Sequence, residues 1–114
     1  MLGRRKFFRK RLKVEVDHFD LDDDYQMHFS RDLSRGGVFI ETDTPLPVGS
    51  RFLMRFDVPG EKPRSIECEV EVAWVMRVED SSSQLPPGMG VRFVDLPEDD
   101  GEAIDAFLRS GSAD

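Results

Sequence analysis

Apolar residues recur at every second position in several short segments of this 114-residue chain. In one of them, Leu12, Val14 and Val16 alternate with charged residues. Alternation with a period of two is typical of a β-strand that buries one face. In another, Tyr25, Met27 and Phe29 alternate with polar residues. The alternating segments and the short apolar runs between turn residues predict six strands, at 12–17, 25–30, 37–42, 51–58, 66–74 and 90–96.

The fifth of these segments has the longest apolar face. Its inward positions are Ile66, Cys68, Val70, Val72 and Trp74. A change of face near Trp74 and Val75 predicts a β-bulge. Because Trp74 continues the apolar face, we interpret it as a core residue rather than as a surface on which a base stacks.

Residues 97–109 have the pattern of a helix. Acidic residues follow Pro97 in the first turn, and Ile104, Phe107 and Leu108 recur at helical spacing. Six short strands and one helix predict an all-β fold, an antiparallel barrel or sandwich with the C-terminal helix over an open end. No internal repeat or linker interrupts residues 1–114, so a single domain is expected.

The charges are distributed unevenly along the chain. The first 13 residues carry seven of the 16 basic residues and no acidic one, which leaves nine basic against 23 acidic residues in the remainder. Seven like charges repel one another and bury little, so residues 1–11 are expected to form a flexible basic arm. An acidic body repels long polyanions such as DNA, which favours a small anion as the ligand of this arm.

Several classes of protein are disfavoured by what the sequence lacks. It has no run of 18 apolar residues that would insert into a membrane and no apolar signal-peptide core. The single cysteine, Cys68, excludes an internal disulfide and favours a cytoplasmic location. The acidic segment 20–24 lacks the remaining ligands of an EF-hand, and His18 and His28 have no partner at metal-ligand spacing. No hydrolase elbow or Walker loop is present. We therefore expect no metal site, no cofactor and no enzymatic activity.

The first candidate site is the segment RKFFR, in which Arg5 and Arg9 are four residues apart. Both side chains are long enough to converge on one small anion. An arginine can bind phosphate oxygens, or the O6/N7 edge of guanine, through two parallel hydrogen bonds. The alternative is a solvated basic tail, which is common at protein termini.

The second candidate site is the loop DLSRGG at 32–37, between two predicted strands. Asp32 offers a carboxylate acceptor for the N1–H and N2–H donors of guanine, and Ser34 offers a hydroxyl. Gly36 and Gly37 allow backbone N–H groups to approach a ligand without a Cβ clash. The alternative is a capped turn in which the aspartate and the serine only satisfy the local backbone.

Together, the two clusters resemble the signature of the PilZ domain, a family of bacterial receptors for the second messenger cyclic di-GMP. That signature is RxxxR followed by DxSxxG or NxSxxG, and both halves are intact at 5–9 and 32–37. The segment 90–95 is similar to the family's terminal GxxF pattern, and Trp74-Val75 matches its usual apolar strand. The resemblance covers residues 4 to about 109 and implies a six-stranded antiparallel barrel with a C-terminal helix.

The resemblance also implies which residues bind cyclic di-GMP: Arg4, Arg5, Arg9, Asp32, Ser34, Arg35, Gly36 and Gly37. The two arginines of RxxxR would hold guanine and phosphate from the arm, and the aspartate and serine would bind them from the loop. Arg4 occupies a position at which an arginine tends to favour two intercalated ligand molecules over one. Arg35 lies at a variable position of the motif and adds at most a phosphate contact. Gly37 would permit the close approach of the backbone.

The function that the resemblance implies is that of a cyclic di-GMP receptor or adaptor. Ligand binding would order the basic arm against the loop, and an unidentified partner protein would bind the resulting surface. We expect a monomer or weak dimer that regulates motility or exopolysaccharide. Two alternatives stay open. One is a PilZ-like adaptor that works by protein contacts alone, and the other is a nucleic-acid binder, whose binding to any DNA or RNA would depend steeply on salt.

Overall fold

The computed structural model describes residues 12–17, 25–60 and 63–110. The predicted basic arm, with Arg4, Arg5 and Arg9, lies outside the described residues, as does the acidic segment 20–24.

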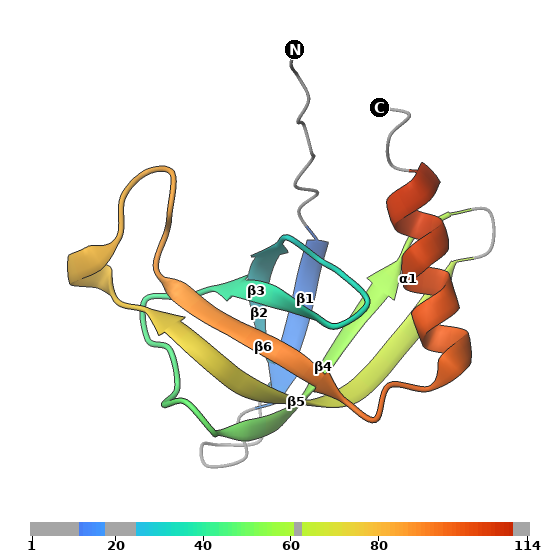
Figure 1. The fold of residues 1–114 in the computed structure, drawn as a ribbon, viewed down its shortest axis with the longest axis horizontal. Helices are drawn as coiled ribbons and strands as arrows, with labels where there is room; N and C mark the ends of the chain where they lie inside the picture. Colours follow the sequence, from blue (N-terminus) through green and yellow to red (C-terminus); the bar gives the residue numbers. More distant parts are fainter. Residues whose placement is uncertain (1–11, 18–24, 61–62, 111–114) are drawn as a thin grey trace.

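Six strands of the described residues form a closed antiparallel barrel with the order β1-β2-β3-β6-β5-β4 (Figure 1). The ring closes because β1 pairs with both β2 and β4. The strands are β1 (Leu12–Asp17), β2 (Tyr25–Arg31), β3 (Gly37–Glu41), β4 (Arg51–Val58), β5 (Arg64–Met76) and β6 (Gly88–Val94). The predicted all-β fold is confirmed, and of the two predicted arrangements the barrel is the one that forms.

Alternate residues of β4 and β5 supply much of the core. The buried side chains of these two strands are Phe52, Met54, Phe56, Val58, Ile66, Cys68, Val70 and Val72. Antiparallel pairing places Met54 opposite Cys68 and Phe56 opposite Ile66, so that inward residues meet in cross-strand pairs. Removal of this apolar surface from water is the main favourable term in the stability of the barrel.

The inner face of β2 differs from the one that its apolar residues indicate. Phe29 is 46% exposed, whereas Ser30 is fully buried opposite Ile40 of β3. Successive side chains of a strand point to opposite faces, so pairing with the buried Ile40 turns Ser30 inward and Phe29 outward. The alternation at 25–30 therefore predicts the strand correctly but assigns the wrong face to Phe29.

The long strand β5 contains the predicted irregularity. Its pairing with β6 shifts register between Val72 and Trp74. Val72 is fully buried, whereas Trp74 is 50% exposed. The interpretation of Trp74 as a core residue is wrong, because the bulge comes before the tryptophan and turns it to the outer face.

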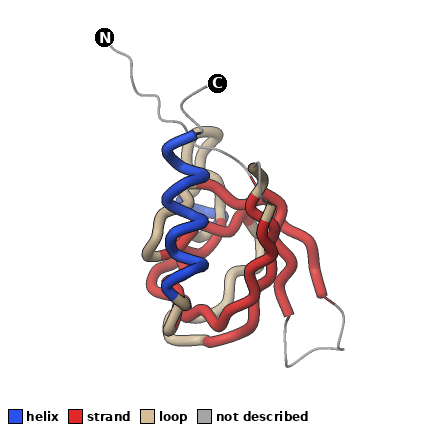
Figure 2. The backbone as a smooth tube through the Cα atoms, turned by 90° about the vertical axis from the view of Figure 1, so that its right-hand side faces the viewer, coloured by secondary structure: helices blue, strands red, loops and turns tan. Residues whose placement is uncertain are grey.

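Helix α1 (Glu98–Ser110) follows β6 and lies along one side of the barrel (Figure 2). It differs by one residue at each end from the predicted range 97–109. Ile104 and Phe107 are buried in the core, while Leu108 is more than a third exposed. On another side of the helix, Arg64 Nε of β5 donates to Asp100 Oδ1 at 2.6 Å. The helix is thus held on the barrel by two apolar side chains and by an ion pair with a buried carboxylate.

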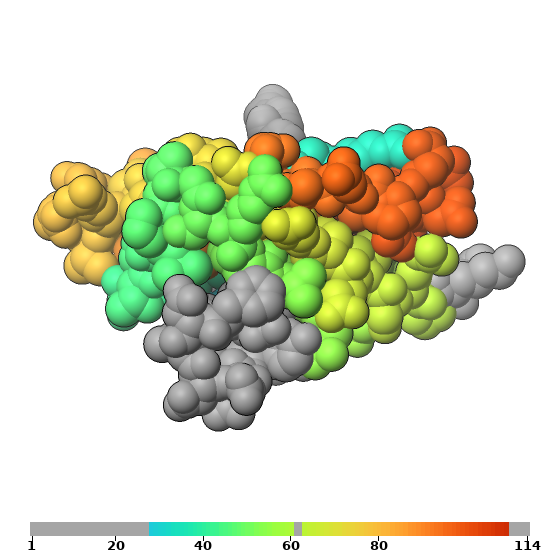
Figure 3. Space-filling model, turned by 90° about the horizontal axis from the view of Figure 1, so that it is seen from below, coloured from blue at the N-terminus to red at the C-terminus, as the bar shows by residue number. Residues whose placement is uncertain are grey.

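The loop that follows β5 projects from the end of the molecule opposite α1 (Figures 1 and 3). It begins with the short 3-10 helix η2 (Val78–Asp80) and runs to β6. In the part of the chain that the structure describes, no helix has the length and apolar character to span a bilayer.

Candidate functional site

The loop between β2 and β3 carries the second predicted motif. Leu33 is buried in the core, while the flanking Asp32 and Ser34 are exposed. Asp32 has a positive φ of 58°, a conformation that aspartate adopts more readily than most residues. The apolar residue therefore anchors the loop, and the polar side chains on each side of it face solvent.

Ser34 organises the turn. Its N–H donates to the carbonyl of Gly37 at 2.8 Å. Its hydroxyl oxygen accepts from the N–H groups of Gly36 and Gly37 at 3.2 and 3.3 Å. This is the turn capping that the sequence left open as an alternative. A ligand that bonds to Ser34 therefore has to compete with these rather long hydrogen bonds.

The two glycines of the motif meet different surroundings. A Cβ on Gly37 would collide with the backbone carbonyl of Val91 in β6, and the nearest atom to a Cβ on Gly36 would be Ser34 Oγ at 3.9 Å, an ordinary contact. The carbonyl of Gly36 accepts from the N–H of Phe93 at 2.9 Å. Gly37 is therefore required by the close packing of the loop on β6, whether or not a ligand approaches.

A hollow of about 270 Å³ lies beside this loop. Four of the predicted site residues line it, together with residues of β3, β5 and β6. Its wall consists of Asp32, Ser34, Gly36, Gly37, Val38, Phe39, Ala73, Trp74, Gly90 and Val91. The structure therefore brings the acidic and hydroxyl groups of the loop next to an aromatic ring that comes from the opposite half of the sequence.

Trp74 is the wall residue that the sequence analysis missed. Its ring stacks on Phe39 with centroids 5.2 Å apart and an interplanar angle of 21°. It also lies on Gly90, where any Cβ would collide with the indole. These contacts hold the ring while half of its surface stays exposed. The available signal was the change of face predicted next to the tryptophan.

Arg35 points away from the hollow. Its Nη1 donates to Asp105 Oδ2 at 2.8 Å, and its Nη2 donates to Glu98 Oε2 at 3.0 Å. Both carboxylates belong to α1, and Arg35 is not among the described residues that line the hollow. The phosphate contact predicted for Arg35 stays a prediction.

The RxxxR motif lies outside the described residues, but the point at which it joins the barrel is described. Leu12, the first residue of β1, pairs with Ser30 of β2, two residues before Asp32. The described start of β1 therefore lies beside the start of the loop.

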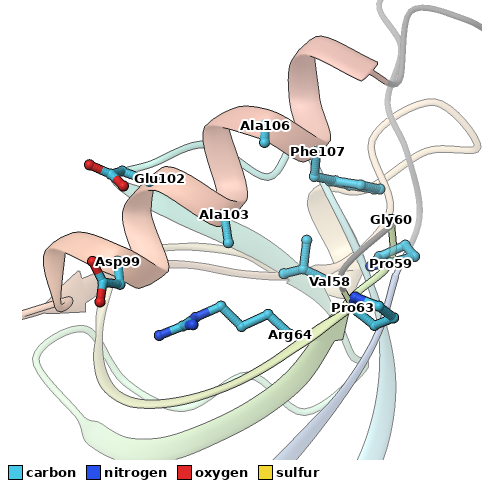
Figure 4. Close-up of a pocket in the computed structure, with 10 residues that line it drawn as sticks. All are labelled: Val58, Pro59, Gly60, Pro63, Arg64, Asp99, Glu102, Ala103, Ala106 and Phe107. Carbon is cyan, nitrogen blue, oxygen red and sulfur yellow. The ribbon is translucent and has the colours of Figure 1, made fainter.

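A second and larger hollow, about 700 Å³, lies between α1 and the turn that joins β4 to β5 (Figure 4). Its apolar wall consists of Val58, Pro59, Pro63, Ala103, Ala106 and Phe107. Its charged groups are Arg64, which already pairs with Asp100, and the acids Asp99 and Glu102. These acids disfavour an anionic ligand, and none of the described motif residues lines this hollow.

The described residues include one buried thiol, that of Cys68. Burial, with a smaller contribution from the charge of Asp100, raises the pKa of the Cys68 thiol to about 11, so the only cysteine of the chain is a neutral core residue. Over the described ranges, no group of three or more His, Cys, Asp or Glu side chains is placed to hold a metal ion.

Fold and loop together define a small antiparallel β-barrel domain with a polar turn and an aromatic ring at one shared hollow. The sequence model of the PilZ domain matches residues 3–110, so the chain belongs to the PilZ domain family. The resemblance found in the two motifs is thereby confirmed.

Two solved structures show the same fold. The Bacillus subtilis inhibitor of motility (MotI/DgrA) has a TM-score of 0.71 and 17% identity, and the match covers 98% of this chain and 53% of that one. The PilZ domain with c-di-GMP of YcgR from Escherichia coli has a TM-score of 0.63 and 17% identity, with 95% and 91% of the two chains covered. The chain thus spans about half the length of the Bacillus protein. No curated protein sequence matches the chain.

Proposed function

We propose that this chain is a receptor for cyclic di-GMP, which it binds between the basic arm and the loop at 32–37, and that it signals through contacts with another protein. The observation that carries the proposal is the hollow that Asp32 and Ser34 of the loop line together with Trp74 of β5. Membership of the PilZ family and the common fold with a PilZ domain solved with c-di-GMP support it.

The groups around the hollow match the chemistry of a guanine nucleotide. The carboxylate of Asp32 can accept hydrogen bonds from N1–H and N2–H of guanine. The exposed half of the Trp74 ring offers a surface for stacking a purine, an interaction that contributes about 1–3 kcal/mol per base in nucleic-acid complexes. The loop thus supplies acceptors and an aromatic face, but a cyclic dinucleotide also needs cations for its two phosphates.

The basic arm is the source of those cations in our proposal. Arg9 is three residues before Leu12, and three residues of chain span at most about 11 Å. Since Leu12 lies beside the start of the loop, this length and the long arginine side chain suffice to reach a ligand next to Asp32. The two phosphates would offset the repulsion among the seven positive charges and order the arm over the loop.

One observation favours the second candidate function, an adaptor that keeps the barrel but binds no nucleotide. The Ser34 hydroxyl and the Arg35 guanidinium, both expected to contact ligand, are bonded within the protein. A direct binding measurement separates the two functions.

The test is a titration of cyclic di-GMP, followed by calorimetry and by the fluorescence of Trp74, the single tryptophan of the chain. We expect the ligand to change this fluorescence. Arg9→Ala and Asp32→Ala should each weaken binding by about tenfold or more, because each removes a hydrogen-bonding partner of the ligand. Arm ordering is read separately from the appearance of dispersed amide resonances for residues 1–11.

Two matched variants control for charge and strain. Arg11→Ala removes the same charge from the arm outside the motif. Asp95→Ala changes another exposed aspartate with a positive φ, 55°, in a different turn. Both should bind within about threefold of wild type. No binding by wild type would favour the adaptor, and equal binding of random DNA would favour the nucleic-acid binder.

A further inference from the structure

In the contact between Arg35 and α1, the loop contributes the guanidinium and the helix contributes two carboxylates. Two N–H groups of the guanidinium reach Asp105 Oδ2 and Glu98 Oε2, at 2.8 and 3.0 Å. Along the chain, Arg35 lies 63 positions before Glu98 and 70 positions before Asp105. Two charge-assisted hydrogen bonds fix the direction of a guanidinium better than one does.

On α1, the Arg35 guanidinium occupies the space that the missing side chain of Gly101 leaves, and we call this space the seat. A Cβ at that position would lie 2.5 Å from Arg35 Nε and 2.8 Å from Nη2, so any larger residue would force the guanidinium to shift. Glu98, Gly101 and Asp105 are spaced three and four residues apart and therefore share one face of the helix. Glycine inside a helix is unfavourable compared with alanine, and the seat offers a reason for its presence here.

On the loop, Arg35 lies at the centre of the turn that contributes to the hollow. It stands between Ser34 and Gly36, which are joined by the bond from the Gly36 N–H to the Ser34 hydroxyl. The carbonyl of Gly36 is bonded in turn to Phe93 of β6. The backbone is thus held by β6, and the Arg35 side chain ties the same turn to the helix.

We propose that Arg35 is a positioning residue of the ligand site, which holds the turn at 34–37 in its binding geometry by docking on the Glu98–Gly101–Asp105 face of α1. Its effect on the ligand rests on the proposed function, whereas its coupling to Gly101 does not. A preorganised turn binds more tightly because less ordering accompanies binding. Coupling is reciprocal, so a protein that binds α1 and disturbs this face also changes the affinity for the ligand.

Two variants that each remove one negative charge from α1 distinguish a positioning role of Arg35 from a direct electrostatic effect on the ligand. Asp105→Asn deletes a negative charge near an anion site, which by Coulomb's law alone favours binding of an anion. We expect the opposite, a Kd for cyclic di-GMP about fivefold higher, because the turn loses its support on the helix. Glu102→Gln removes the same charge from an exposed position of the same helix and should not raise the Kd.

A double-mutant cycle tests the seat without any ligand. In wild type, Gly101→Ala should raise the Tm less than it does without Arg35, because the new methyl group displaces the Arg35 guanidinium and this loss offsets part of the helix gain. In the Arg35→Ala background the same change should raise the Tm, since alanine favours the helix once the seat is empty.

Arg51→Ala is the matched control for Arg35→Ala. Arg51 also bridges two carboxylates, Glu69 and Glu71, but on the barrel wall, and its loss should leave the Kd within about twofold.

The outcomes are distinguishable. If Gly101→Ala changes the Tm equally in wild type and in the Arg35→Ala variant, Arg35 and Gly101 are not coupled, whatever the result with the ligand. Tighter binding by Asp105→Asn than by Glu102→Gln overturns the positioning role, because Arg35 would then be a ligand contact that the helix restrains. If wild type binds no cyclic di-GMP, the proposed function fails and the Tm cycle alone decides whether Arg35 couples loop and helix.

Discussion

Cys68 is a residue whose protonation state depends on the fold. It lies in the barrel core opposite Met54 and is only 7% exposed. Burial and, to a smaller extent, the charge of Asp100 raise its pKa from the ordinary 9.0 to about 11. The folded protein therefore accommodates the neutral thiol and disfavours the thiolate.

This shift predicts a pH-dependent stability. The unfolded thiol ionises near pH 9, so the thiol's contribution to the free energy of unfolding is complete below about pH 9 and is lost as the pH rises through about 11. Urea unfolding of wild type and Cys68→Val across this window measures it. Since all other titrating groups are shared, wild type should lose more stability than the variant. Parallel losses in the two proteins would contradict the assignment.

At the scale of elements, the contact of the site loop with β6 depends on the absence of a side chain at the start of β3. Gly37 pairs with Arg92 of β6, and a Cβ at Gly37 would meet the Val91 carbonyl and the Arg92 Cα. The backbone atoms of a paired strand cannot move aside as the end of a flexible side chain can. The junction of β3 and β6 therefore tolerates only glycine here.

We expect Gly37→Ala to lower the free energy of unfolding by about 2–3 kcal/mol, as overpacking against backbone does. Gly36→Ala is the matched control, because its Cβ would make only an ordinary contact with Ser34 Oγ at 3.9 Å. That variant should stay within about 0.5 kcal/mol of wild type. Chemical denaturation of the two variants gives both values, and similar losses would show that the β6 contact is not the cause.

At the scale of the whole molecule, α1 packs on the barrel through a small number of side chains. Ile104 is fully buried and Phe107 nearly so, and both join the core of the barrel. On its flanks the helix pairs with Arg64 of β5 and with Arg35 of the loop. The apolar contacts are expected to contribute most of the docking energy, because exposed ion pairs contribute only about 0–1 kcal/mol each.

We therefore expect Ile104→Ala to destabilise the protein by about 3 kcal/mol, within the range for truncation of a fully buried Ile. Leu108→Ala, at a neighbouring position of α1 that is 37% exposed, should cost less than about 1 kcal/mol. Thermal and urea unfolding measure both changes. A large loss from Leu108→Ala would mean that the helix buries a different face from the one described.

Local pattern predicted the elements well because strand alternation and helix capping involve residues close in sequence. The strand Arg51–Val58 has the predicted bounds, and α1 lies within one residue of its predicted range. The candidate loop at 32–37 was also predictable, since its motif is contiguous. Phe29 and Trp74 were assigned to the wrong face, because each face depends on pairing with a strand that no local pattern specifies.

The sequence by itself determined the strands, the C-terminal helix, the basic composition of the first residues and the family signature, because each depends on neighbouring residues or on their order. Only the tertiary structure decided that Trp74 shares a hollow with Asp32 and that Arg35 turns to α1. Those contacts join segments about 40 and 70 residues apart. The first contact exists because β6 pairs with both β3 and β5 and because a one-residue shift in register turns Trp74 to the outer face. The second exists because the loop packs on β6, the strand that α1 follows.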